Sequence, residues 1–211
     1  MEKEIETHPI PNGFIPRDVH VLVIGTFPPR KEYVEKKEGF FFYSSEKNHF
    51  WNRMDNIFNH NPGLKRTKSK NSSETFLHNR YRKEAFAKIH KIGFLDIFHK
   101  ISRKKDSADD NDIISIEDVI SNGRLKDVII KNKDIKRICC TYKLAYEVIK
   151  NNICHIGSEY KIEKDERTAN SEKIILNLEN RKIEVVLLYP ATRSGHKSDL
   201  KDIQYQYFLF H

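Results

Sequence analysis

The sequence predicts an α/β fold built on a short, mainly parallel sheet. Three apolar, β-branched runs have the length of buried strands, at residues 19–26, 135–141 and 183–189. Each is followed by apolar residues at helical spacing, and strands that alternate with helices are typical of a parallel sheet. A length of 211 residues and a hydrophobic content of 38% suit one domain with one core. We therefore expect residues 1–211 to form a single domain with one site.

Apolar residues at helical spacing predict four helices. The residues that define them are Phe50, Trp51, Met54, Ile57 and Phe58 in the first, Tyr81, Ala85, Phe86 and Ile89 in the second, Leu144, Ala145, Val148 and Ile149 in the third, and Leu200, Ile203 and Tyr207 in the fourth. The second is expected over residues 80–91, with its apolar residues facing inward and Gly93 as its C-terminal stop. The fourth begins near Ser198.

Charge and cysteine content narrow the classes of function. A formal net charge of +8 and a pI near 9.2 favour a polyanionic partner, although lysine-rich runs are often only solvated loops. Three cysteines, two of them adjacent at Cys139 and Cys140, argue against a disulfide framework. The longest apolar runs are far shorter than the roughly 20 residues of a membrane span. The first residues are polar, so we expect a soluble, cytoplasmic protein with no membrane partner.

Two loops that follow predicted strands are the expected place for a site. Residues 25–29 follow the first strand, and residues 190–196 follow the last. Ligands of open parallel sheets gather where loops leave the carboxyl ends of the strands. The chemistry is therefore expected in these two loops and in the elements beside them.

Four segments, in order along the chain, share the features of one known family. Residues 21–29 form a strand and loop similar to a motif that ends in Gly-x-x-Pro-Gly, and residues 42–51 contain an aromatic pair followed by Asn-x-Phe-Trp. Residues 93–98 with Arg103 resemble an element that lines a base pocket, and residues 187–194 lie where a second loop motif is expected. In these segments the sequence resembles the uracil-DNA glycosylase superfamily, most closely its mismatch-specific and hypoxanthine-DNA glycosylase branches.

The resemblance implies both a fold and an activity. The fold would be a three-layer α/β/α sandwich around a short, mainly parallel central sheet. The activity would be that of a monofunctional DNA glycosylase, which hydrolyses the N-glycosidic bond of a deaminated or otherwise damaged base that has left the base stack. Its partner would be DNA, with no cofactor and no metal, and we expect a monomer. The alternative is a non-catalytic nucleic-acid-binding protein of the same fold.

The sequence departs from the family at one catalytic position. The mismatch-specific branch carries an Asn at the third position of the first motif, where this chain has Phe27. Phe27 cannot orient a water molecule. The resemblance to the hypoxanthine branch moves that role to Asn48, whose amide can both accept and donate. Asn48 directly precedes a predicted helix, so an ordinary helix cap is the competing interpretation.

Asp96 lies where the uracil-selective branches tend to carry an Asn. An ionised Asp only accepts hydrogen bonds, so it would suit a base edge that offers donors, or it would serve as the base that activates water. The competing interpretation is a structural Asp that caps a helix or pairs with Arg103 or Lys100.

The remaining candidate residues belong to base binding and DNA binding. Those expected to surround the flipped base are Gly25, Thr26, Phe27, Phe42 and Tyr43, whose aromatic members can stack on it. Those expected to contact phosphate or duplex are Arg193, Ser194, His196 and Lys197, at the start of the last helix. For Phe42, and for its neighbours Phe40 and Phe41, packing in the core is an equally good explanation.

Overall fold

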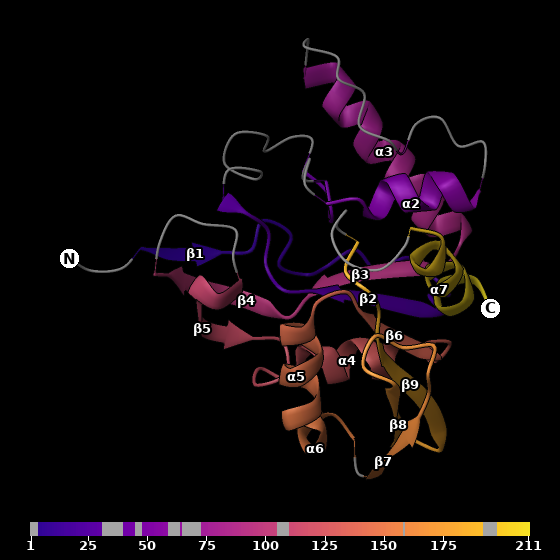
Figure 1. The fold of residues 1–211 in the computed structure, drawn as a ribbon. Coiled ribbons are helices and arrows are strands. Elements are labelled where there is room, and N and C mark those ends of the chain that lie inside the picture. The colour runs from indigo at the N-terminus through magenta and orange to yellow at the C-terminus, as the bar shows by residue number, and fades with distance from the viewer. Residues whose placement is uncertain are drawn as a thin grey trace.

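The computed structural model has a six-stranded central sheet and a three-stranded sheet beside it (Figure 1). The structure describes residues 4–30, 40–44, 48–58, 64, 73–104, 110–157, 159–191 and 198–211, except for the side chains of residues 73–78 and 198. The central strands are β2 (Val21–Gly25), β3 (Ile92–Asp96), β6 (Arg137–Cys140), β7 (Glu159–Lys164), β8 (Glu172–Leu178) and β9 (Arg181–Leu187), in the spatial order β3-β2-β6-β9-β8-β7.

The parallel half of the central sheet contains all three predicted strands. β3, β2, β6 and β9 are parallel neighbours, whereas β8 pairs antiparallel with β9 and β7 pairs antiparallel with β8. The runs predicted at 19–26, 135–141 and 183–189 are β2, β6 and β9. These three strands are buried on both faces, which is why each is a nearly continuous apolar run.

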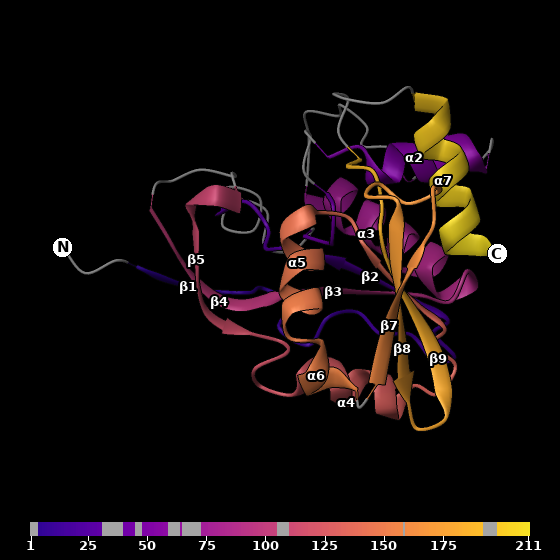
Figure 2. The same ribbon diagram turned by 60° about the horizontal axis from the view of Figure 1, so that its bottom comes forward.

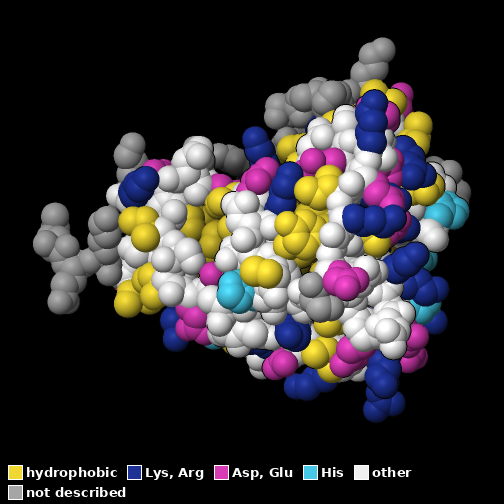
Figure 3. Space-filling model, turned by 90° about the horizontal axis from the view of Figure 1, so that it is seen from below, with side chains coloured by type: hydrophobic (Ala, Val, Ile, Leu, Met, Phe, Trp, Pro, Cys, Tyr) yellow, Lys and Arg dark blue, Asp and Glu magenta, His cyan; other side chains and the backbone are white. Residues whose placement is uncertain are grey.

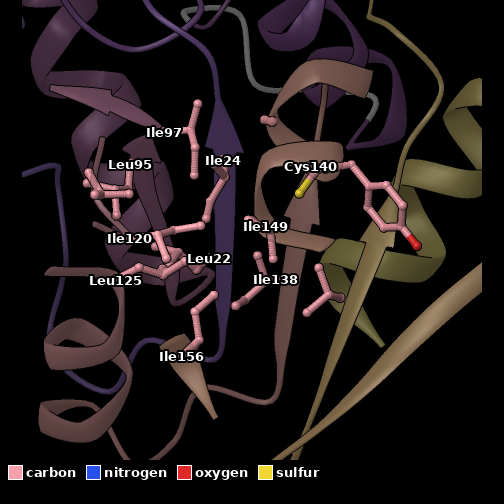
Figure 4. Close-up of a cluster of buried hydrophobic side chains, with 14 of the residues drawn as sticks. Leu22, Ile24, Leu95, Ile97, Ile120, Leu125, Ile138, Cys140, Ile149 and Ile156 are labelled. Atoms are coloured by element: carbon pink, nitrogen blue, oxygen red, sulfur yellow. The ribbon is translucent and has the colours of Figure 1, made fainter. Parts of the chain in front are cut away.

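Alternate residues of these strands face two different layers of helices. One side of the sheet packs on α2 (Phe50–Ile57), α3 (Ser73–Ile89) and α7 (Ser198–Phe210), and the other on α4 (Arg124–Lys131), α5 (Lys143–Asn151) and the short α6 (Ile153–Ile156) (Figures 1 and 2). In β2, Val21 and Val23 pack in the apolar cluster beneath α2, α3 and α7. Leu22 and Ile24 pack in the cluster beneath α4, α5 and α6, which Figure 4 shows. The fold is therefore the predicted α/β sandwich with helices on both faces of the sheet.

All four predicted helices are present, as α2, α3, α5 and α7, but the buried faces of α3 and α7 differ from the prediction. In α3, Tyr81 and Ile89 are exposed, with 61% and 74% of their surfaces accessible, whereas Lys83 and Phe86 point inward. In α7, Leu200 and Ile203 are exposed, while the inward residues are Lys201, Gln204, Tyr205, Phe208 and Leu209. The apolar pattern misled because buried lysines interrupt both inward faces. Their aliphatic stems pack like apolar groups.

Gly93 was expected to end the second helix, but the structure shows that it does not. α3 ends at Ile89, and the left-handed residue that follows it is Lys91, with φ 57°. Gly93 instead lies inside β3, a strand that the sequence did not predict, where it pairs with Leu22. A side chain at this position would approach Val19 and Leu22 within 3.0 and 3.1 Å, so the glycine allows close packing of two strands.

The second sheet joins the N-terminal segment to the end of β3. It contains β1 (Ile5–Thr7), β4 (Phe98–Arg103) and β5 (Ile113–Asp118), all antiparallel, in the order β1-β4-β5. β4 begins two residues after β3 ends, and β1 pairs Thr7 with Lys100. This sheet therefore brings the first residues of the chain to the carboxyl end of β3.

The surface on the side of α6 and β7 carries charges of both signs. Figure 3 shows Lys and Arg side chains interspersed there with Asp and Glu, with apolar side chains between them. The net charge of +8 is therefore not concentrated on this face. Among the described residues, no helix combines the length and the apolar character needed to cross a membrane.

Phe94 lies at the centre of an aromatic cluster between β3, α2 and the segment before α2. Its side chain is 1% exposed and contacts the rings of Phe41, Phe42, Tyr43, Phe50 and Trp51 at centroid distances of 5.6–5.9 Å. This cluster is what holds the aromatic segment 40–44 against the sheet.

Phe94→Ala is expected to lower the free energy of unfolding by about 3–5 kcal/mol, because the substitution leaves a cavity among rings that cannot collapse fully. Urea denaturation followed by fluorescence measures the loss. Tyr81→Ala, at an exposed position, is the control and should change stability by less than about 0.5 kcal/mol. Similar effects of both substitutions would contradict the central place of Phe94.

Candidate active site

Three neighbouring strands end at the same edge of the sheet and carry candidate functional groups there. Gly25, the last residue of β2, pairs in register with Asp96, the last residue of β3. Thr141 follows the end of β6, and its backbone N–H donates to the carbonyl of Ile24 at 3.0 Å. Because ligands of open α/β sheets bind at the carboxyl ends of the strands, this edge is the candidate site.

Asp96 is buried and bonded to a histidine from the N-terminal segment. Its side chain is 9% exposed, and its Oδ2 lies 2.9 Å from Nε2 of His8, which is 4% exposed. The other ring nitrogen of His8, Nδ1, accepts the backbone N–H of Ile10 at 3.0 Å. Since Nδ1 is an acceptor, the proton is assigned to Nε2, and the Nε2–H group of the neutral imidazole donates a hydrogen bond to Asp96.

Gly25 allows two polar groups to approach the backbone at this edge. A Cβ on Gly25 would lie 2.4 Å from Oδ1 of Asp96 and 2.9 Å from the hydroxyl of Tyr43, closer than atoms can pack. The second carboxylate oxygen and the tyrosine hydroxyl therefore converge on one point above Gly25. Any side chain at this position would displace at least one of them.

Tyr43 is held in an unfavourable backbone conformation. Its φ is 58°, in the left-handed region that a bulky residue rarely adopts, in a turn closed by the N–H of Ser44 donating to Phe41. Its ring stacks on Phe50 at 4.8 Å, and its hydroxyl lies 2.9 Å from Oγ1 of Thr141. Burial, and next the charge of Asp96, raise the pKa of Tyr43 well above its usual value, so the phenol stays protonated.

Asn48 has two partners, one in helix α2 and one at the end of β6. Its Oδ1 accepts the N–H of Phe50, the first residue of α2, at 2.9 Å, and its Nδ2 donates to the hydroxyl of Tyr142 at 3.0 Å. The amide thus supports the start of the helix and also lies beside Tyr142, at the edge that carries Asp96. Burial, and next the charge of Asp110, raise the pKa of Tyr142 to about 12.

Thr26 and Phe27 are held by groups from the second sheet and the segment beside it. Oγ1 of Thr26 donates to Asp110 at 2.8 Å. The guanidinium of Arg103 lies 5.6 Å from the ring centre of Phe27, and it binds Glu6 at 2.9 Å in a buried ion pair.

Asp96 therefore pairs with neither Arg103 nor Lys100, the partners that the sequence suggested. Lys100 binds Glu117.

Of the predicted base-binding residues, Gly25 and Tyr43 lie beside Asp96, whereas Phe27 and Phe42 lie around its partner His8. Phe42 and Phe27 are 2% and 6% exposed, and both pack against His8, at 5.7 and 5.3 Å. These two rings belong to the core in this conformation. Tyr43 is partly exposed and is the predicted aromatic residue best placed to contact a ligand. The predicted DNA contacts at Arg193, Ser194, His196 and Lys197 lie outside the described residues.

Four residues of this edge were missed by the sequence reasoning: His8, Asp110, Thr141 and Tyr142. Thr141 and Tyr142 were detectable, because both lie directly after β6, a correctly predicted strand, and ligand-binding residues are expected at that place. His8 and Asp110 carry no such signal in the sequence. In the described part of the chain, no group of three or more His, Cys, Asp or Glu side chains is arranged to hold a metal ion.

A comparison of whole structures supports the fold. A solution NMR structure of a protein from Methanosarcina acetivorans, described as a "putative Uracil DNA glycosylase", matches with a TM-score of 0.50 and 15% sequence identity, over 97% of this chain and 99% of that one. The fold is uracil-DNA-glycosylase-like. No protein-family model matches the sequence, and no curated protein matches it either.

Gly25→Ala is expected to destabilise the protein by about 1–3 kcal/mol, because the new methyl group overlaps the carboxylate of Asp96. The matched test repeats the substitution in an Asp96→Ala background, where the obstructing oxygen is gone and the added cost should shrink. Urea unfolding of the four proteins completes the cycle. Additive costs, within about 0.5 kcal/mol, would show that the two residues do not press on each other.

The raised pKa of Tyr142 predicts a loss of stability in alkali. Between pH of about 10 and about 12, the unfolded chain releases a proton that the folded protein retains, so the free energy of unfolding falls as pH rises. Tyr142→Phe should make this fall shallower, because one of the contributing phenols is removed. Denaturation at a series of pH values measures the slope, with Tyr81→Phe as the exposed control. An unchanged slope in Tyr142→Phe would place the phenol in water.

Proposed function

We propose that this protein is a DNA glycosylase that hydrolyses the N-glycosidic bond of a deaminated or otherwise damaged base, of the uracil or hypoxanthine type. The observation that carries the proposal is the Asp96 carboxylate, held by a neutral histidine at the carboxyl edge of a uracil-DNA-glycosylase-like sheet. Three of the four segments that resemble the superfamily support the proposal, because Gly25, Tyr43, Asn48 and Asp96 all lie at this edge.

The charge of Asp96 suits the chemistry of base removal. Cleavage of a glycosidic bond passes through an oxocarbenium-like sugar, which carries positive charge. His8 is neutral, so the negative charge of Asp96 is not cancelled by its partner. A preorganised carboxylate in a buried site stabilises the developing cation, and it can also accept a proton from the attacking water.

Asn48 is proposed to orient the attacking water. Its amide is fixed at both ends, by Phe50 and by Tyr142, and a fixed amide holds a water molecule in one orientation better than a free one. The oxygen Oδ1 has two lone pairs, so it can accept a second hydrogen bond while it binds the N–H of Phe50. The contact of Nδ2 with Tyr142, which follows the end of β6, supports a role for the amide at this edge of the sheet.

The rival proposal is a nucleic-acid-binding protein of the same fold without catalysis. It is favoured by two observations: Phe27 stands where a water-orienting Asn is found in relatives, and both polar groups of Asn48 already have protein partners. Both proposals predict DNA binding that weakens steeply with salt, because phosphate contacts release counterions. Only the first predicts base release.

The test is incubation of the purified protein with oligonucleotides that each carry one uracil, hypoxanthine, xanthine or alkylated base, followed by alkali to cut abasic sites. Cleavage of at least one substrate supports the glycosylase. Salt-dependent binding without cleavage of any supports the binding protein. The absence of both would overturn the assignment of DNA as partner.

Two substitutions at Asn48 separate its amide from its support of the helix. Asn48→Ala removes both and should lower turnover by about 10²–10³, with a loss of stability of about 1 kcal/mol. Asn48→Asp keeps the oxygen that accepts from Phe50 but loses the donor, so stability should be retained while turnover falls. Single-turnover kinetics and thermal unfolding measure the two effects. If Asn48→Asp retains full activity, the amide has no part in catalysis.

A further inference from the structure

We propose that His8 is a positioning residue, which holds Asp96 as a charged acceptor with Oδ1 turned toward the ligand. The inference rests on the proposed function for its kinetic consequences, whereas the geometry of the pair can be tested without it. No motif of the sequence pointed to His8, which lies 88 residues before Asp96 in the chain.

The backbone around His8 is fixed by the second sheet. β1 pairs with β4 up to Thr7 and Lys100, and the backbone N–H of His8 donates to His99 at 2.9 Å. The buried ion pair of Glu6 with Arg103 anchors the same strand, with side chains 6% and 5% exposed. The pairing of β1 with β4 therefore holds His8 at the end of β3.

The ring of His8 is fixed as firmly as its backbone. It stacks on Phe42 at 5.7 Å with an interplanar angle of 22°, and it meets Phe27 edge to face at 5.3 Å. The N–H of Ile10 donates to Nδ1, so rotation of the ring would break this hydrogen bond and leave a partly buried donor without its partner. Packing and hydrogen bonding thus select one rotamer and one tautomer.

This arrangement gives the two oxygens of Asp96 different roles. Oδ2 accepts the hydrogen bond of the Nε2–H group, while Oδ1 lies above Gly25, beside the hydroxyl of Tyr43. An ionised carboxylate has no hydrogen to donate, so Oδ1 presents only an acceptor. The side of the site that Asp96 forms therefore recognises an N–H of the base or an O–H of water, and His8 sets the direction of that recognition.

The test compares three substitutions at His8 with a matched histidine outside the site. His8→Phe keeps the ring but loses the donor. His8→Gln places an N–H near the position of Nε2, and His8→Asn places one near Nδ1, too short to reach Asp96. His99→Phe is the control, because His99 lies on the neighbouring strand and pairs with Glu117.

His8→Phe and His8→Asn should lower kcat about 10- to 100-fold with little change in KM, since a misdirected catalytic group slows the reaction without weakening DNA binding. His8→Gln should recover most of that loss, and His99→Phe should retain the wild-type rate. A purely structural role would instead lower the melting temperature in step with the size of the packing defect, with no rescue by Gln. Equal rates in His8→Asn and His8→Gln would overturn the proposal.

Nitrogen-15 NMR of the imidazole tests the geometry without any substrate. The expected signals of His8 are those of the neutral Nε2–H tautomer, and Asp96→Asn should shift them while Glu117→Gln should not. If the wild-type protein releases no base but these signals appear, the proposed function fails and the positioning stands. A proton on Nδ1, or no response to Asp96→Asn, would overturn the positioning itself.

Discussion

The parallel pairing of β2 with β3 sets Gly25 beside Asp96, and the other groups of the candidate site are arranged around this contact. Because Gly25 has no side chain, one carboxylate oxygen and the hydroxyl of Tyr43 can both reach the backbone of β2. Tyr43 can do so only from a left-handed conformation, which costs roughly 1–3 kcal/mol and persists because the surrounding aromatic rings pack against it. The site thus depends on the absence of a side chain at Gly25 and on the strained backbone conformation of Tyr43.

Three of the central strands were predictable because burial on both faces of the sheet requires apolar residues. β2, β6 and β9 are covered by helices on both faces, so their buried positions carry apolar residues. β3 has the same burial but contains Gly93 and ends in Asp96, which weakens the apolar run and resembles a helix stop. The inward faces of α3 and α7 were misjudged because Lys83 and Lys201 are buried. Lys83 satisfies its charge by donating to Ser44 and lying over Trp51, contacts that periodicity cannot reveal.

The candidate site was predictable only in part, because local sequence patterns do not reveal long-range contacts. Asn48 and Asp96 stand in segments that resemble a known family, and the structure places both at the carboxyl edge of the sheet. Their partners could not be inferred, because Asn48 meets Tyr142 across 94 residues and Asp96 meets His8 across 88. Contacts of that separation are created by the topology of the two sheets. A local pattern of residues contains no information about them.

The protonation states around Asp96 give the site an electrostatic character different from that of the whole chain. His8 is neutral, and burial keeps the phenols of Tyr43 and Tyr142 protonated, so none of these three groups adds a charge near the carboxylate. The chain as a whole carries a formal charge of +8. In the proposed reaction these two features serve different steps. The overall positive charge attracts the phosphate backbone, whereas a localised negative charge is needed where the sugar becomes cationic. A cationic His8 would weaken that second effect, so its neutral tautomer matters as much as its position.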